Sequence, residues 1–243
     1  YSTIGDMFPK KTKKRKLSVK QARRLMLDEE ADKLIESGVV TIDDVVATNG
    51  SRVLEGQKVL ISGNPVVPND DHIYIALNKP LGITCTTDKR DVDNIVDFLG
   101  FEERIFPIGR LDKNSSGLIL LTNDGDIVNK LLRAEHGHEK EYVVSVDKPF
   151  DDEFLSKMAN GVPVLDRITL PCKIRRNGPR TFTIILTQGL NRQIRRMCEY
   201  LGYKVTKLKR IRFMNIELGD MKPGEYRNLT NKEKQVLFSL TKK

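Results

Sequence analysis

The sequence has few of the residues that build metal centres and disulfide frameworks. Its 243 residues include only three cysteines, Cys85, Cys172 and Cys198, an odd number at wide spacing. No pair of cysteines has the spacing of a zinc site, so we expect neither zinc nor a disulfide scaffold. We therefore expect the protein to work in a reducing compartment. His136 and His138 stand close together, but no cysteine or third histidine lies near them in the sequence. We therefore assign no metal.

Long apolar runs and a balance of charge are also missing. No apolar run approaches the length that crosses a bilayer, so no membrane partner is expected. Lys and Arg number 42 against 33 Asp and Glu, which gives a net charge of +9 and a pI near 9.4. A hydrophobic content of 39% can fill one large domain, or a large and a small one. The excess of positive charge makes nucleic acid the expected partner.

A polar loop lies between two apolar runs near the middle of the chain. It reads Gly-Arg-Leu-Asp-Lys-Asn-Ser-Ser-Gly over residues 109–117, and the apolar runs occupy 105–108 and 118–121. Short apolar runs predict buried strands, so the core would hold both ends of the loop and fix Asp112. A calcium loop is excluded, because Asn123 stands where a bidentate Glu is required. Composition alone leaves a catalytic carboxylate and an ordinary turn equally open.

Three separated motifs follow one another in a fixed order. Gly-Arg-Leu-Asp and then Ser-x-Gly-Leu-x-Leu-Leu-Thr-Asn-Asp-Gly occupy residues 109–125, Lys-Pro-x-Gly occupies 79–82, and Arg-Gln-Ile-Arg-Arg-Met occupies 192–197. Together they resemble the signatures of RNA pseudouridine synthases, specifically the bacterial ribosomal RNA type that carries a small N-terminal RNA-binding domain. The resemblance extends over about residues 73–230.

The resemblance implies roles for particular residues. Asp112 would be the nucleophile, Tyr142 would stack on the target base and take part in proton transfer, and Arg195 would face Asp112, because a buried carboxylate stays ionised only beside a cation. The residues implied to bind the substrate are Arg110, Lys113, Arg192 and Arg196, which would hold phosphates, and Leu208, which would form an apolar floor. Isomerisation of uridine needs no metal and no cofactor.

The implied function is isomerisation of a specific uridine in structured RNA. Ribosomal RNA of the large or small subunit is the expected substrate, and transfer RNA is the second candidate. The target base would have to leave its stack to be reached. Two alternatives stay open, a catalytically silent RNA-binding ribosome-assembly factor and a hydrolase that uses Asp112 as a base. We expect a monomer in the cytoplasm, with an organelle as the alternative because the chain begins with basic residues.

The predicted organisation has three parts. These are a basic tail over 1–16, a small RNA-binding-like domain over 17–70 and a catalytic domain over 71–243, with a Pro-rich polar linker before residue 71. The small domain should contain a helix over 18–37 and then short strands. It departs from the family pattern at Asp28-Glu29 and at Asp43-Asp44, which add negative charge. Both RNA contact and a docking role therefore stay open for it.

The catalytic domain is predicted to be α+β with a mainly antiparallel mixed sheet, since hairpins and helices mix without regular alternation. The predicted strands are 73–77, 83–87 and 139–147, and the predicted helices are 126–133, one capped by Asp151 or Asp152 and ending at Gly161, one over 192–201 capped by Asn191, and a terminal helix capped by Thr230. Basic residues between 204 and 212 are expected to track phosphates.

Overall fold

The computed structural model describes residues 2–3, 32–53, 57–65, 72–133 and 137–241. The chain divides into two compact units, an N-terminal unit of Tyr1–Ile73 with Phe101–Arg104 and a C-terminal unit of Tyr74–Gly100 with Ile105–Lys243. The domain boundary expected near residue 70 lies outside the described residues and stays a prediction. No helix in the described ranges is long and apolar enough to cross a membrane.

The N-terminal unit contains a small antiparallel sheet in the order β3-β2-β5-β6. Its strands are β2 (Val40–Ile42), β3 (Val45–Val46), β5 (Val59–Ile61) and β6 (Asn64–Pro65), and a separate pair joins β1 (Ser2–Thr3) to β4 (Arg52–Val53). Val40, Ala47 and Val59 form its core. The short strands expected here are confirmed. The basic tail and most of the helix expected over 18–37 lie outside the described residues, although residues 32–36 are helical.

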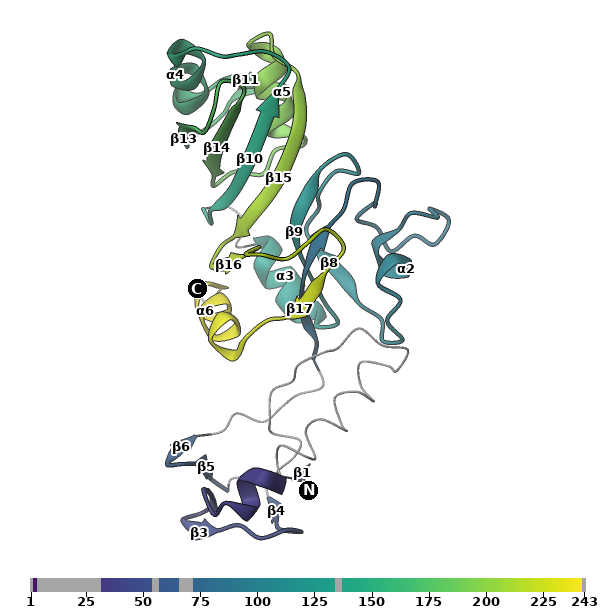
Figure 1. The fold of residues 1–243 in the computed structure, drawn as a ribbon, viewed down its shortest axis with the longest axis vertical. Coiled ribbons are helices and arrows are strands. Elements are labelled where there is room, and N and C mark those ends of the chain that lie inside the picture. The colour runs from purple at the N-terminus through teal and green to yellow at the C-terminus, as the bar shows by residue number, and fades with distance from the viewer. Residues whose placement is uncertain (1, 4–31, 54–56, 66–71, 134–136, 242–243) are drawn as a thin grey trace. The chain divides into compact units, whose positions relative to one another are not determined.

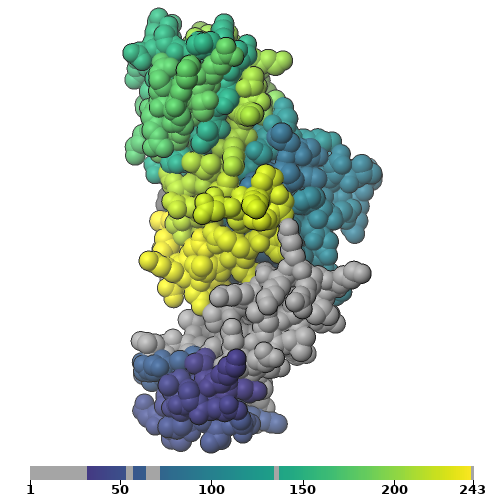
Figure 2. All heavy atoms as spheres, viewed as in Figure 1, coloured from purple at the N-terminus to yellow at the C-terminus, as the bar shows by residue number. Residues whose placement is uncertain are grey.

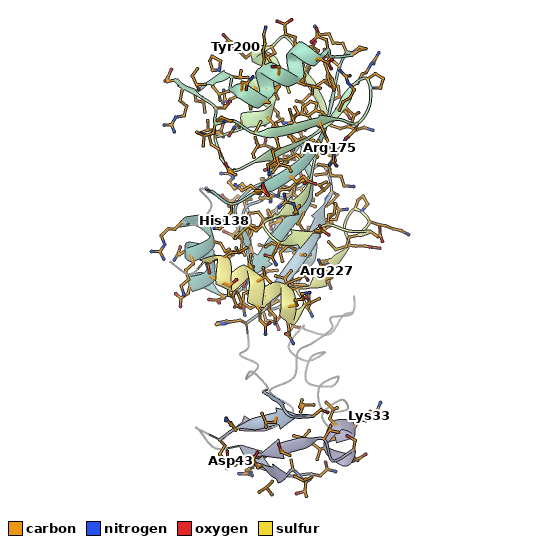
Figure 3. All side chains as sticks on the ribbon, turned by 90° about the vertical axis from the view of Figure 1, so that its left-hand side faces the viewer. Lys33, Asp43, His138, Arg175, Tyr200 and Arg227 are labelled. Atoms are coloured by element: carbon orange, nitrogen blue, oxygen red, sulfur yellow. The ribbon has the colours of Figure 1, made fainter. Side chains whose placement is uncertain are left out.

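The turn between β2 and β3 explains one departure from the family pattern. Asp43 and Asp44 both have positive φ, 49° and 66°, which is the conformation that a two-residue hairpin turn requires. The Asp43 N–H donates to the carbonyl of Lys58, and its Oδ1 accepts from the N–H of Lys58 at 2.9 Å. Figure 3 labels Asp43 in this unit. The Asp43 carboxylate therefore has a structural partner within the small sheet.

The C-terminal unit is built on a nine-stranded sheet in the order β13-β14-β10-β15-β9-β7-β17, with β8 beside β9 and β16 beside β15 (Figure 1). Every pairing is antiparallel except that of β15 with β9. The strands are β7 (Tyr74–Lys79), β8 (Phe106–Ile108), β9 (Ser116–Thr122), β10 (Lys140–Val146), β13 (Lys173–Arg176), β14 (Thr181–Leu186), β15 (Val205–Phe213), β16 (Ile216–Glu217) and β17 (Tyr226–Asn228). The predicted α+β class with a mainly antiparallel mixed sheet is confirmed.

The helices and a small hairpin complete this unit. They are α2 (Ile95–Leu99), α3 (Gly125–Arg133), α4 (Asp152–Asn160), α5 (Gln193–Tyr200), α6 (Asn231–Thr241) and the hairpin of β11 (Pro163–Val164) with β12 (Arg167–Ile168). Asp151 caps α4 by accepting from the N–H of Phe154, and Gly161 ends it. Thr230 and Glu233 form a reciprocal capping box at the start of α6. Both predicted caps are confirmed.

The sheet has two hydrophobic cores, one in each half. The β10 half consists of β10, β13, β14, α4 and α5, with a core that includes Val144, Phe154, Phe182 and Met197. The β9 half consists of β7, β8, β9, β17, α3 and α6, and its core includes Leu118. Figure 1 shows β15 running from one half into the other, and in Figure 2 the green residues of the β10 half lie above the yellow C-terminal residues.

The two halves meet where β15 pairs with β9. The pairing is parallel and places Lys209 opposite Ser116 and Arg210 opposite Gly117. Gly117 has φ of 108°, and a Cβ at this position would overlap the backbone of Arg210. Only glycine allows this approach, because it has no Cβ and tolerates positive φ. The glycine that closes the polar loop is thus required by the junction of the halves.

Two local predictions are wrong. No strand forms over residues 83–87, where only Thr84 makes an isolated bridge, to Asn94. The Thr84 backbone bonds to Asp93 and Ile95, so this segment pairs with the turn before α2 rather than with the main sheet. The helix predicted over 192–201 begins at Gln193, and Asn191 is not its cap. The Asn191 side chain instead accepts from Arg196.

Candidate active site

The loop that carries Asp112 connects β8 to β9 and is held by hydrogen bonds within it and to neighbouring segments. The N–H of Ser115 donates to the carbonyl of Asp112 at 2.9 Å, which closes a turn. The N–H of Leu111 donates to Cys85 Sγ at 3.4 Å, and the carbonyl of Lys113 accepts from the N–H of Gly82 at 2.9 Å. Asp112 therefore has a defined position, and its side chain is 36% exposed.

Arg195 reaches this loop from α5. Its side chain is only 10% exposed, and Nη2 donates at 2.9 Å to both the carbonyl of Asn114 and the hydroxyl of Ser115. Its Nε lies 3.8 Å from Asp112 Oδ2 and makes no hydrogen bond to the described residues. Burial and the charge of Arg192 lower the pKa of Arg195, and Asp112 opposes this. An arginine remains protonated at neutral pH in either case.

Arg192 is the nearer of the two cations. Its Nη1 lies 3.2 Å from Asp112 Oδ2, and its side chain is 39% exposed. It precedes α5 with φ of 49°, a left-handed conformation that is uncommon for a residue other than glycine. Gln193 supports this turn, because its buried side chain accepts from the N–H of Leu190 and donates to Gln188. Two guanidinium groups thus face one carboxylate.

Asp112 lies at the boundary of two pockets. The first, which we call the base pocket, has a volume of about 540 Å³ and is also lined by Tyr142 of β10, Leu208 of β15 and Arg195. The second, which we call the flanking pocket, has a volume of about 890 Å³. The residues that line both are Arg110, Leu111, Asp112, Arg192 and Leu208. The structure therefore brings together most of the site residues expected from the sequence.

Lys113 and Arg196 are placed differently from the rest. Lys113 lines only the flanking pocket, and its Nζ lies 3.0 Å from Asp93 Oδ2, a hydrogen bond that raises the pKa of Lys113. Arg196 lines neither pocket. Its guanidinium donates to the backbone and the side chain of Asn191 at 3.0 Å. Arg196 thus stabilises the turn that precedes α5.

Phosphate tracking along β15 was an incorrect expectation for two of its basic residues. Arg210 is buried, donates from Nε to the carbonyl of Leu118 at 2.8 Å and lines the base pocket. Arg212 contacts Glu139 at 3.3 Å and Glu141 at 3.5 Å. Strand alternation carried the missed signal, because it buries Leu208 and Arg210 on either side of the exposed Lys209.

Lys79 is another residue whose place the sequence did not reveal. It is fully buried, and Nζ donates to the carbonyls of Pro80 at 3.0 Å and Ile83 at 2.8 Å. Burial lowers the pKa of Lys79, while Cys85 and Asp112 oppose this. Its position in the Lys-Pro-x-Gly motif was the available signal. Lys79 holds the turn that donates to the Asp112 loop.

The assembled groups are suited to covalent chemistry on an anionic substrate. The base pocket offers a carboxylate, a phenol, an apolar surface and several guanidinium groups. A carboxylate held beside cations can act as a nucleophile toward a sugar carbon, as Asp and Glu do in other enzymes. Within the described ranges, no three His, Cys, Asp or Glu residues gather as metal ligands would.

Comparison with known proteins assigns the chain to a family. Residues 73–200 match the model of the RNA pseudouridylate synthase family, and the chain belongs to that family. It is 54% identical over 213 residues to the dual-specificity RNA pseudouridine synthase RluF of Salmonella typhi, covering 87% of this chain and 74% of the relative. It is 35% identical to the ribosomal large subunit pseudouridine synthase B of Bacillus subtilis, covering 86% and 89%.

A solved structure agrees with this assignment. The crystal structure of a pseudouridylate synthase superposes with a TM-score of 0.64 at 26% identity, covering 86% of this chain and 93% of that one. The chain is an RNA pseudouridine synthase of the bacterial ribosomal RNA type, as its motifs indicated. No observation favours a catalytically silent relative.

Proposed function

We propose that Asp112 is the nucleophile that isomerises a specific uridine in bacterial ribosomal RNA. The observation that carries this role is the placement of the Asp112 carboxylate against Arg192 and Arg195 in a pocket also lined by Tyr142. In the reaction, the bond from the ribose C1′ to uracil N1 breaks and a bond from C1′ to C5 forms. The proton leaves C5 and N1 gains one, so the atoms balance without a cofactor.

The other residues of the base pocket have supporting roles in this proposal. Arg195, held by two hydrogen bonds to the Asp112 loop, keeps a positive charge beside the carboxylate as the covalent bond forms and breaks. Tyr142 packs on the detached uracil and is the candidate to accept the C5 proton. Leu208 forms an apolar floor that excludes water from the reactive intermediate.

Basic residues at the edge of the site hold the RNA backbone in this proposal. Arg110 and Lys113 are exposed, and Arg192 is partly exposed, so all three are accessible to phosphates. The base itself enters the pocket after extrusion from its stack. A second RNA substrate, transfer RNA being the candidate, is suggested by the dual specificity in the name of the RluF relatives.

We infer that the enzyme acts as a monomer in the bacterial cytoplasm. A single chain supplies Asp112, Tyr142, Arg192 and Arg195, so the base pocket needs no residue from a second copy. The names of its relatives refer to the ribosomal subunits, and bacteria make ribosomal RNA in the cytoplasm.

Pseudouridine mapping tests the proposed function. RNA from cells with and without the gene is compared, and the deletion strain is complemented with the wild type or with Asp112→Asn. We expect one or a few pseudouridines to disappear on deletion and to return only with the wild type. Return of the modification with Asp112→Asn would remove Asp112 as the nucleophile. An unchanged map in the deletion strain would reject the proposed substrate.

A further inference from the structure

The flanking pocket is larger than the base pocket and has no part in the chemistry proposed above. It extends from Asp112 on the side of the turn that follows β7, and Leu81, Gly82 and Cys85 line it there. Lys207 and Lys209 of β15 line it as well. Its volume of about 890 Å³ lies within the range of about 300–1,000 Å³ that is usual for small-molecule sites.

An apolar surface and a basic edge distinguish this pocket. Leu81, Leu111 and Leu208 supply the apolar surface, and Leu81 leaves 66% of its own surface exposed. The basic residues in its lining are Arg110, Lys113, Arg192, Lys207 and Lys209. Among the described residues, Asp112 is the one carboxylate in that lining. This combination suits an uncharged planar group joined to phosphates, which describes a nucleotide of RNA.

The position of Leu81 is fixed by the buried lysine beneath it. Lys79 donates to the carbonyls on both sides of the turn, those of Pro80 and Ile83, and the N–H of Gly82 donates to the carbonyl of Lys113. Burying a lysine is costly unless its charge is hydrogen-bonded, and both acceptors here belong to this one turn. The turn is thereby tied to the Asp112 loop, with an exposed leucine at its tip.

We propose that the flanking pocket receives the base of a nucleotide adjacent to the target uridine, so that the enzyme extrudes and holds two bases, one on each side of Asp112. This inference rests on the proposed function. Because the two pockets share Arg110, Asp112 and Arg192, neighbouring nucleotides of one strand can occupy both. Among the described residues, the lining holds no aromatic ring. The base would therefore contact the leucine side chains and the faces of the arginine guanidinium groups. A flanking base would then contribute to the choice of site.

Abasic substitution in the RNA tests the subsite. A short RNA that carries the mapped target uridine is made intact and with an abasic nucleotide at each adjacent position in turn. The single-turnover rate of pseudouridine formation is measured for the wild type, for Leu81→Ala and for the control Leu240→Ala. Leu240 is a partly exposed leucine of α6 that lines neither pocket. Equal urea midpoints for the three proteins establish that all are folded.

We expect one abasic position to slow the wild type by about tenfold, as loss of a bound base does elsewhere. Leu81→Ala should slow the reaction on intact RNA by about fivefold. On the abasic RNA it should cause no further loss, because that RNA lacks the base that Leu81 contacts. Leu240→Ala should match the wild type on every RNA. If the losses from Leu81→Ala and from the abasic nucleotide multiplied as independent effects, the subsite would be overturned. An absence of any effect of the abasic nucleotides would also overturn it. A wild type inactive on the intact RNA would instead count against the proposed function.

Discussion

The β9 half and the β10 half contribute to the site in different ways. The β9 half supplies Asp112 on a loop held mainly by backbone hydrogen bonds, and Lys79 braces the neighbouring turn. The β10 half supplies Arg195 and Tyr142, and the turn before α5 depends on hydrogen bonds of side chains such as Gln193. The carboxylate therefore belongs to one half, and Arg195 of the other half also donates two hydrogen bonds to its loop. Its pairing with arginine is a property of how the two halves meet.

Removal of the carboxylate should have the largest effect. Asp112→Asn keeps the side-chain size but cannot form the covalent bond, so we expect kcat to fall by roughly 10⁴-fold or more. RNA affinity should change little, because phosphate contacts supply most of it. Single-turnover rates and filter binding measure the two quantities. Substantial activity in the variant would show that the β9 half does not supply the nucleophile.

Gly117→Ala should separate the halves at their junction. A Cβ there overlaps the Arg210 backbone and adds the strain of a positive φ, so we expect a loss of roughly 3 kcal/mol or more in the free energy of unfolding and a loss of activity. Gly202→Ala is the matched control, because Gly202 has φ of 86° and open space at its Cβ. It should lose about 1–2 kcal/mol. Urea unfolding measures both, and equal losses would mean that the junction tolerates a wider approach.

The two arginines should differ in the kinetic constant that they affect. Arg195→Lys keeps the charge but lacks the forked guanidinium that bonds Asn114 and Ser115, so kcat should fall by about 10–100-fold. Arg192→Lys changes a partly exposed group and should mainly raise KM, by less than about tenfold. Steady-state kinetics on one RNA distinguish them. A larger loss of kcat in Arg192→Lys would assign the pairing role to Arg192.

Substitution of Glu233 tests whether the β9 half can lose stability without a change in the active site. Burial would raise the pKa of Glu233, but hydrogen bonds from Arg227 and Thr230 outweigh it and the pKa is lowered. The resulting stability is present above the unfolded pKa of about 4.3 and is lost as pH falls through the folded value. We expect Glu233→Gln to lose roughly 1–2 kcal/mol at pH 7 and less near pH 3.

The exposed pair of Glu153 with Lys157 is the control for this measurement. Glu153→Gln should change the free energy of unfolding by less than about 0.5 kcal/mol at either pH. Urea unfolding at pH 7 and pH 3 gives both values, and activity at pH 7 should be unchanged in both variants. Figure 3 shows Arg227, the partner of Glu233, in the β9 half. A pH-independent loss in Glu233→Gln would assign its role to packing rather than to charge.

Deletion of residues 1–70 should have the smallest effect on chemistry, because the base pocket lies entirely in the C-terminal unit. We expect a soluble, active domain with weaker RNA binding, since the deleted segment carries the basic residues between 10 and 16. Each lost phosphate contact should flatten the plot of log affinity against log salt by about 0.7–0.9. Binding at several salt concentrations measures the slope. Equal slopes would favour a docking role for the N-terminal unit.

Local patterns in the sequence determined much of this protein. Apolar runs predicted β8 and β9, so Asp112 was expected between them, and cap residues marked the ends of α4 and α6. Such signals act over a few residues and do not depend on the rest of the fold. The resemblance of the motifs then selected Asp112, Tyr142 and Arg195, and the structure lines one pocket with all three.

Only the tertiary structure decided which groups surround Asp112. That Arg192 lies nearer than Arg195, that Arg210 is buried and that Lys79 braces the turn at Leu81 all depend on packing between distant segments. Arg210 and Leu118 bond across 92 positions of the chain, and no local propensity specifies such a contact. For Arg210, the parallel pairing of β15 with β9 sets this placement. That pairing is possible because Gly117 leaves room for the backbone of Arg210.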